Sequence, residues 1–370
     1  MSVTSIDDYV IVNKRILKLV GLYPINYLRY STCLFSMLLI VVPQISQLYL
    51  DRGDFTVILE TSSVLSTIML AILKMFVWIC NPEIPLLVEY MMTNYWRTAQ
   101  LFDDDNHISG RNMTRGYCFL IANALVVFFT IQPVKLVAEK MRRDVDGASE
   151  RSFPFPAVYP KCCYYSPFYE LAFASQIIAT CACGLIIIAI DGLIASALFH
   201  TSGHFKIIRE NLLNLDPISR LVRKRLATFS DGMEKAFNPI MFLQVFASSL
   251  IICLVGFQVT STISENDRLV EYSSYLVMAL FQILLFCWPG GEMLLESTMI
   301  GQAAYSMNWY SMKASGDVKV EVYLIILRSQ KPCYLTAGKL YPMSMQSFGG
   351  VNRLIFFPSY FLKINNFYYF

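Results

Sequence analysis

The chain is divided into apolar blocks of about twenty residues, which is the length that an α-helix needs to cross about 30 Å of hydrocarbon. Hydrophobic residues make up 55% of the chain and charged residues only 15%. That is too little charge to form the solvated surface of a soluble protein. Six blocks are predicted to span a membrane: Leu28–Leu50, Thr61–Cys80, Gly116–Val137, Leu171–Phe199, Phe237–Thr260 and Tyr272–Leu295.

A seventh apolar and aromatic block, near Met343–Phe370, is interrupted by Arg353, Pro358 and Lys363. Together the blocks predict an all-α polytopic membrane protein, a seven-transmembrane helix bundle. The formal net charge of +3 is too small to indicate a nucleic-acid partner. Most of the ten cysteines lie inside apolar blocks, where a thiol behaves as a small hydrophobic group. Cys162 and Cys163 instead lie in a polar loop, where they are open to oxidation if that loop is extracellular.

The basic residues predict the orientation of the bundle. The chain opens without a secretory signal peptide, so we expect the first span to act as its own insertion signal and residues 1–27 to be cytoplasmic. With the N-terminus inside, the inner segments hold more than twice as many Lys and Arg residues as the outer loops. This bias predicts an intracellular N-terminus and an extracellular C-terminus. A glycosylation sequon at Asn112 then falls inside the cell, where we interpret it as a chance match.

Two charged residues fall inside predicted spans. Lys74 lies near the inner end of its span, and we expect its side chain to extend to the lipid headgroups. Asp191 lies deeper and must find a partner or water, since an isolated carboxylate in a bilayer is costly. Two interpretations of Asp191 stay open, a structural hydrogen bond within the bundle and a role in gating.

No residue pattern indicates an enzyme, a metal site or a cofactor. The three histidines are His107, His200 and His204. His200 and His204 share one helix face but have no third ligand at useful spacing, so we expect a surface or interhelical role. The acidic run Asp103–Asp105 could attract a cation, but a solvated acidic turn is the simpler interpretation.

Several stretches between about residues 190 and 348 resemble the insect odorant receptor family, in the family's order. They are Leu198–Phe205 leading out of the fourth span, Asp231–Phe237 before the fifth, Ala303–Tyr305 and Asn308–Tyr310 after the sixth, Leu324–Pro332, and Tyr341–Phe348. The resemblance implies an odour-gated, non-selective cation channel in the plasma membrane, expected in sensory neuron dendrites. It also implies a heterotetramer in which this chain binds a small volatile odorant and a co-receptor supplies the other subunits.

The resemblance further implies how the chain is divided. Residues 28–295 would form six transmembrane helices with an odorant pocket in their outer half. Residues 296–342 would form a cytoplasmic anchor that joins subunits. Within it, Val318–Leu327 alternates apolar and charged residues and then turns fully apolar, and this pattern itself suits a short helix buried between subunits. Residues 343–370 would form the pore-lining seventh helix. By analogy, the pocket residues would be Ser66, Met69, Phe128, Phe129, Gln132, Phe173, Ile177, Tyr272, Tyr275 and Met278. Aromatic and methionine side chains with a few polar groups suit a small apolar ligand.

The chain departs from the family after Phe348. Pro358 would interrupt a helix there, and Arg353 and Lys363 are expensive inside lipid. The run from Gly350 to Arg353 can be encoded by a splice-donor-like sequence, so we hypothesise that residues from about 349 onward translate an unspliced intron. A transcript that runs contiguously through this point would contradict that hypothesis.

Two other functional classes remain as alternatives. A G-protein-coupled-type chemosensory receptor would carry a basic-acidic signature at the inner end of its third helix and an Asn-Pro pair in its seventh. Here Asn238-Pro239 begins the fifth span instead. A small-solute transporter would show paired broken helices and repeat symmetry, and neither is evident.

Overall fold

The computed structural model describes residues 7–50, 53, 55–91, 153–213, 218–261, 266–306, 316–350 and 353. Within them, five helices are long and apolar enough to cross a membrane. They are α2 (Tyr27–Leu50), α3 (Phe55–Cys80), α7 (Phe168–Leu213), α8 (Ile218–Ser261) and α9 (Asn266–Ser306). These helices contain the first, second, fourth, fifth and sixth predicted spans, so the prediction of an all-α membrane bundle is confirmed. The third predicted span, Gly116–Val137, lies outside the described residues.

Three of the helices are much longer than a membrane requires. α7, α8 and α9 contain 46, 44 and 41 residues. At 1.5 Å per residue they extend about 60 to 70 Å, roughly twice the thickness of the hydrocarbon layer. The predicted extension after the fourth span is confirmed, because α7 continues without a break to Leu213. The fifth helix begins at Ile218, well before the predicted start near Asp231.

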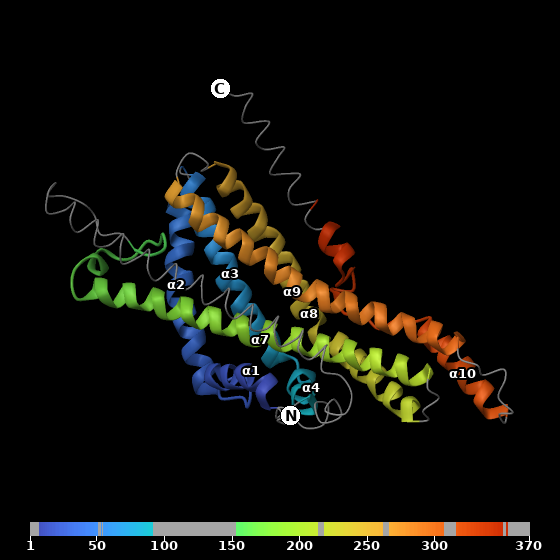
Figure 1. The fold of residues 1–370 in the computed structure, drawn as a ribbon. Coiled ribbons are helices and arrows are strands. Elements are labelled where there is room, and N and C mark those ends of the chain that lie inside the picture. The colour runs from blue at the N-terminus through green and yellow to red at the C-terminus, as the bar shows by residue number, and fades with distance from the viewer. Residues whose placement is uncertain are drawn as a thin grey trace.

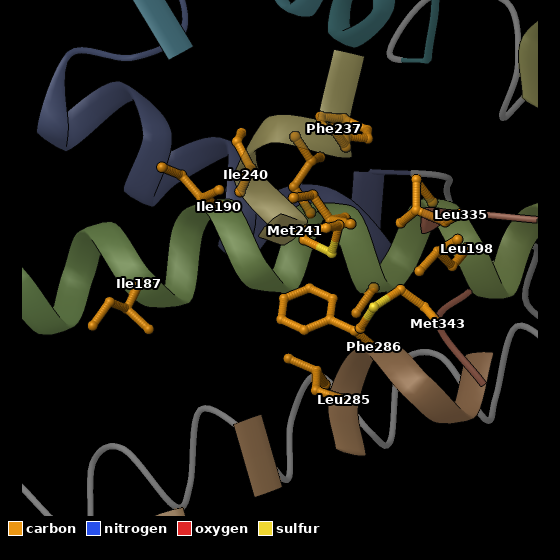
Figure 2. Close-up of a cluster of buried hydrophobic side chains, with 14 of the residues drawn as sticks. Ile187, Ile190, Leu198, Phe237, Ile240, Met241, Leu285, Phe286, Leu335 and Met343 are labelled. Carbon is orange, nitrogen blue, oxygen red and sulfur yellow. The ribbon is translucent and has the colours of Figure 1, made fainter. Parts of the chain in front are cut away.

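Helix α7 is the core of the bundle. Almost every side chain from Ile186 to Leu198 is buried, as expected of a helix that is covered on all sides. Figure 2 shows this stretch with Phe237, Ile240 and Met241 of α8 on one side and Leu285 and Phe286 of α9 on the other. α7 packs most extensively against α9 and also contacts α8, and Figure 1 shows α7 and α9 converging along their length.

Two short helices that the sequence did not predict lie at the end of the bundle where α2 begins (Figure 1). α1 (Asp7–Val20) packs against α7, and α4 (Glu83–Tyr90) packs against α8. Gly21 ends α1 at a φ of 84°, and a Cβ there would lie 2.7 Å from the Asn26 carbonyl oxygen, so only glycine fits this turn. The indole of Trp78 on α3 donates to the Leu22 carbonyl at 3.2 Å, which fixes the turn to the bundle.

The segment after α9 folds back onto the bundle. α10 (Gly316–Ser329) packs along α9, which confirms the predicted helix at this place. A small hairpin follows, in which β1 (Thr336–Ala337) pairs antiparallel with β2 (Tyr341–Pro342). Glu234 of α8 accepts from the Thr336 amide at 2.7 Å and from its hydroxyl, so the hairpin is held on α8.

The chain then enters a helix over 345–350, at the position expected for the seventh helix. Gly290 of α9 permits the approach, because a Cβ at that position would lie 2.5 Å from the Met343 carbonyl oxygen. Most of the departing tail after Phe348, including Pro358 and Lys363, lies outside the described residues.

Candidate functional site

A buried ion pair joins α3 to α7 in the middle of the bundle. The Lys74 Nζ lies 2.5 Å from Asp191 Oδ1, and both side chains are 0% exposed. The expectation that Lys74 extends to the headgroups is therefore wrong. Its side chain turns inward because a carboxylate lies opposite on α7, and an ammonium that is paired with it is far cheaper to bury than one without a partner. The expectation that Asp191 finds a partner is confirmed.

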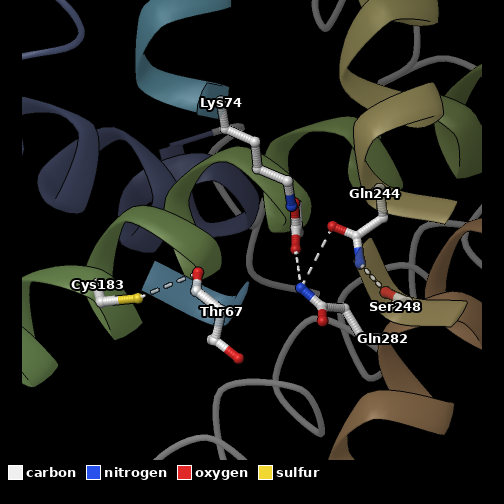
Figure 3. A network of polar contacts seen from close by, with 7 residues as sticks. Thr67, Lys74, Cys183, Gln244, Ser248 and Gln282 are labelled. Carbon is white, nitrogen blue, oxygen red and sulfur yellow. Dashed lines mark hydrogen bonds and ion pairs between the residues drawn. The ribbon is translucent and has the colours of Figure 1, made fainter. Parts of the chain in front are cut away.

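The ion pair belongs to a larger polar network, shown in Figure 3. The second carboxylate oxygen of Asp191 accepts from Gln282 Nε2 of α9 at 2.8 Å. The same nitrogen lies 3.4 Å from Gln244 Oε1 of α8, and the Gln244 amide donates to the Ser248 hydroxyl at 2.6 Å. All five side chains are buried. The Asp191 carboxylate thus joins α7 to α3 and α9, and Gln282 extends the network to α8.

A second polar contact lies seven residues away along the helices. The Tyr275 hydroxyl of α9 hydrogen-bonds the Thr67 hydroxyl of α3 and donates to the Ser63 carbonyl at 3.1 Å. Thr67 precedes Lys74 by seven residues, and Tyr275 precedes Gln282 by seven. Two helical turns correspond to about 10 Å, so the contacts form two layers between the same helices. Cys183 of α7 adds to the second layer by donating to the Thr67 carbonyl at 3.8 Å.

The predicted pocket residues on α3 and α9 lie within three residues of Thr67 or Tyr275 along the chain. Met69, Tyr275 and Met278 are partly buried against the core, and Tyr272 is buried. Ser66 is partly buried, and its hydroxyl donates to the Ser62 carbonyl of its own helix at 2.7 Å. The Tyr275 hydroxyl is directed to α3, so this side chain joins α9 to α3.

The remaining predicted pocket residues divide into two groups. Phe173 and Ile177 are partly buried near the start of α7, where the Phe173 ring lies 6.1 Å from that of Tyr169. Phe128, Phe129 and Gln132 lie outside the described residues. The network residues Gln282, Gln244 and Ser248, and the Thr67 contact, were missed by sequence reasoning. The signal that could have found them is the seven-residue spacing of polar residues within otherwise apolar spans.

A loop covers this end of α7. The buried Gln176 side chain accepts from the Phe155 amide at 3.1 Å and donates to the Tyr159 hydroxyl at 3.2 Å. The Val158 amide donates to the Pro43 carbonyl of α2 at 3.3 Å. The Phe153 ring packs against Tyr159, Tyr164 and Tyr169, with centroid distances of 4.7, 5.4 and 5.2 Å. Residues 153–165 therefore form a cap over the start of α7.

We expect single substitutions of the ion pair to be far more damaging than their combination. Lys74→Met leaves a buried carboxylate without its cation, and Asp191→Asn leaves a buried ammonium, each at a cost of about 3 to 5 kcal/mol. The double variant buries no net charge and should regain most of that loss. Thermal unfolding midpoints of the detergent-solubilised variants provide the measurement. If the two losses simply add in the double variant, the side chains do not interact as described.

Comparison with known proteins identifies relatives of the chain. The family model described as 7tm Odorant receptor matches residues 54–356. Odorant receptor 13a of Drosophila melanogaster is 25% identical over 254 residues, which cover 60% of this chain and 59% of the relative. Odorant receptor 82a of the same species is 21% identical over 357 residues, 88% of this chain and 89% of the relative. The Odorant receptor coreceptor of Anopheles gambiae is 27% identical over 128 residues, 35% of this chain and 26% of the relative.

The fold has a counterpart among solved structures. The insect olfactory receptor OR5 from Machilis hrabei, in complex with eugenol, superposes with a TM-score of 0.80 over 99% of this chain and 100% of that one. At 14% sequence identity this likeness establishes a shared fold. The family match covers most of the chain, including the helices that carry both polar layers. The chain therefore belongs to the 7tm odorant receptor family of insects.

Proposed function

We propose that this chain is the odour-binding subunit of a ligand-gated, non-selective cation channel. The observation that carries the proposal is the family match over residues 54–356. The shared fold with an olfactory receptor solved with eugenol supports it. The same match favours this function over a G-protein-coupled-type receptor or a small-solute transporter. The chain would lie in the plasma membrane of sensory neurons, including their dendrites, with its N-terminus inside and its C-terminus outside.

The odorant pocket is proposed at the layer around the contact between Tyr275 and Thr67. With the N-terminus inside, α3 enters the membrane from the outer side, so this layer lies closer to the outside than Lys74 does. Met69, Tyr272 and Met278 supply apolar and aromatic surface there. Such a lining suits a small volatile molecule, because burial of apolar surface supplies most of the affinity and few polar groups set its orientation. Phe128, Phe129, Gln132, Phe173, Ile177 and Ser66 would complete the wall.

Gating would use the polar network around Asp191, on the cytoplasmic side of the proposed pocket. A ligand that fits one packing of α3 against α9 better than another shifts the population toward that packing. Tyr275 and Gln282 lie on the same rigid helix, so a displacement of α9 at the pocket moves the partner of Asp191 as well. We propose that Asp191 passes this displacement to α7 and α8, which continue to the end of the bundle near the seventh helix.

Assembly with a co-receptor is proposed through α10. Val320, Tyr323, Leu324 and Leu327 form an exposed apolar stripe on this helix, with exposed fractions from 43% to 61%. Such a stripe outside the membrane calls for a partner surface. Residues 296–342 would act as a cytoplasmic anchor in a heterotetramer. The similarity of a part of this chain to the Odorant receptor coreceptor supports a shared interface.

A larger side chain at Met278 tests the proposed pocket. Met278→Trp should raise the odorant concentration for half-maximal current about 5- to 150-fold, because overpacking a filled site costs about 1 to 3 kcal/mol. Val277→Trp is the matched control, since Val277 is 56% exposed on the neighbouring position of α9. Concentration-response curves from cells that also express the co-receptor give the measurement, with surface expression checked for each variant. Equal shifts in both variants would place the pocket elsewhere.

A charged substitution on α10 tests the proposed assembly surface. Leu324→Asp should reduce co-purification with the co-receptor at least about tenfold, because a buried carboxylate replaces a leucine whose burial is worth about 1.5 to 3 kcal/mol. Arg328→Ala on the same helix is the control. It removes only an exposed ion pair with Asp231 at 3.6 Å, worth about 0 to 1 kcal/mol. Unchanged co-purification of the Leu324 variant would exclude α10 from the interface.

A further inference from the structure

Two adjacent cysteines lie in a 3₁₀ turn of the cap over α7. The turn, η2, runs from Lys161 to Tyr164. The Cys162 and Cys163 sulfur atoms lie 4.0 Å apart. Cys162 is exposed and Cys163 is partly exposed. Neither takes part in the packing of the bundle or in the proposed odorant pocket, so these two thiols have no role in the function described above.

The adjacent positions of the two cysteines suit a shared metal ion better than a disulfide. A disulfide between neighbouring residues is strained, because consecutive Cα atoms lie about 3.8 Å apart, below the usual range of about 4.4 to 6.8 Å for a disulfide. A tetrahedral Zn²⁺ with bonds of about 2.3 Å to both sulfurs would hold them about 3.8 Å apart. The observed separation differs from that value by only a few tenths of an ångström, which a small rotation of either side chain supplies.

The protein backbone holds the two thiols in this arrangement without an ion. The Cys163 amide donates to the Pro160 carbonyl at 2.8 Å, and the Tyr165 amide donates to the Cys162 carbonyl at 3.3 Å. The contacts of Gln176 with the preceding residues fix the cap to α7. An ion that binds to both sulfurs therefore meets a preformed pair and does not have to order the loop first.

We propose that Cys162 and Cys163 bind a thiophilic metal ion, of the Zn²⁺ or Cu⁺ type, through both sulfurs. Thiolates select these soft ions over Mg²⁺ or Ca²⁺. On binding, two S–H bonds break, two metal–sulfur bonds form and two protons pass to solvent, with no change of oxidation state. Among the described residues, no third His, Cys, Asp or Glu joins the pair. The remaining coordination positions are open to water, which makes the ion exchangeable.

Protection of the thiols from alkylation tests this site directly. The full chain, in detergent-opened membranes of cells that express it, is treated with N-ethylmaleimide with and without Zn²⁺, and each cysteine is followed by mass spectrometry. Zn²⁺ at about ten times its Kd should slow alkylation of Cys162 and Cys163 about tenfold, and EDTA should restore it. Cys80 is exposed and stands alone at the end of α3, so its alkylation should not change.

Single substitutions distinguish a bidentate site from general metal binding. In Cys162→Ser, the remaining thiol of Cys163 should be alkylated at its metal-free rate with Zn²⁺ present, and the reverse should hold in Cys163→Ser. Three results would overturn the proposal. They are no protection in the natural sequence, equal protection in the single variants, or a pair that resists alkylation until it is reduced. None of these readouts requires current, so they are independent of the proposed channel function.

Discussion

The ion pair between Lys74 and Asp191 sets the arrangement of the membrane helices. Both charges are fully buried in an apolar bundle, where either one alone would be strongly destabilising. Their contact fixes the position of α3 along the axis of α7. The second carboxylate oxygen of Asp191 fixes the axial position of α9 through Gln282. Once these axial positions are set, Tyr275 meets Thr67 two helical turns away. The reason is that Thr67 precedes Lys74, and Tyr275 precedes Gln282, by the same number of residues.

The proposed recognition and gating would use two layers of polar contacts within this one bundle. In one layer, Tyr275 of α9 contacts Thr67 and Ser63 of α3. The other layer connects the same two helices to α7 and α8, which extend well beyond the membrane. Glu234 and Gly290 then hold the hairpin and the start of the seventh helix against α8 and α9. A chain of contacts therefore leads from the proposed pocket to the segment expected to line the pore.

Much of the fold could be predicted from the sequence, since apolar blocks of membrane length determine the helices directly. The extension of α7 followed from resemblance to a family, and the helix α10 from the residue pattern of Val318–Leu327. The short helices α1 and α4 were missed because they are too short to give a membrane signal. The direction of the Lys74 side chain was mispredicted for a different reason. Its position along α3 is visible in the sequence, but the residue that faces it depends on the rotation and height of α7, which only the packed bundle determines.

The central claim is that an odorant opens a channel that contains this chain, without any soluble messenger. Outside-out membrane patches are taken from cells that express the chain with the co-receptor, with a pipette solution free of GTP. These patches isolate direct opening of the channel by an odorant. Odorants applied from a panel should evoke a non-selective cation current in these patches within the time of solution exchange. Odour responses that appear in intact cells but are lost in the patches, or that require GTP, would contradict the claim.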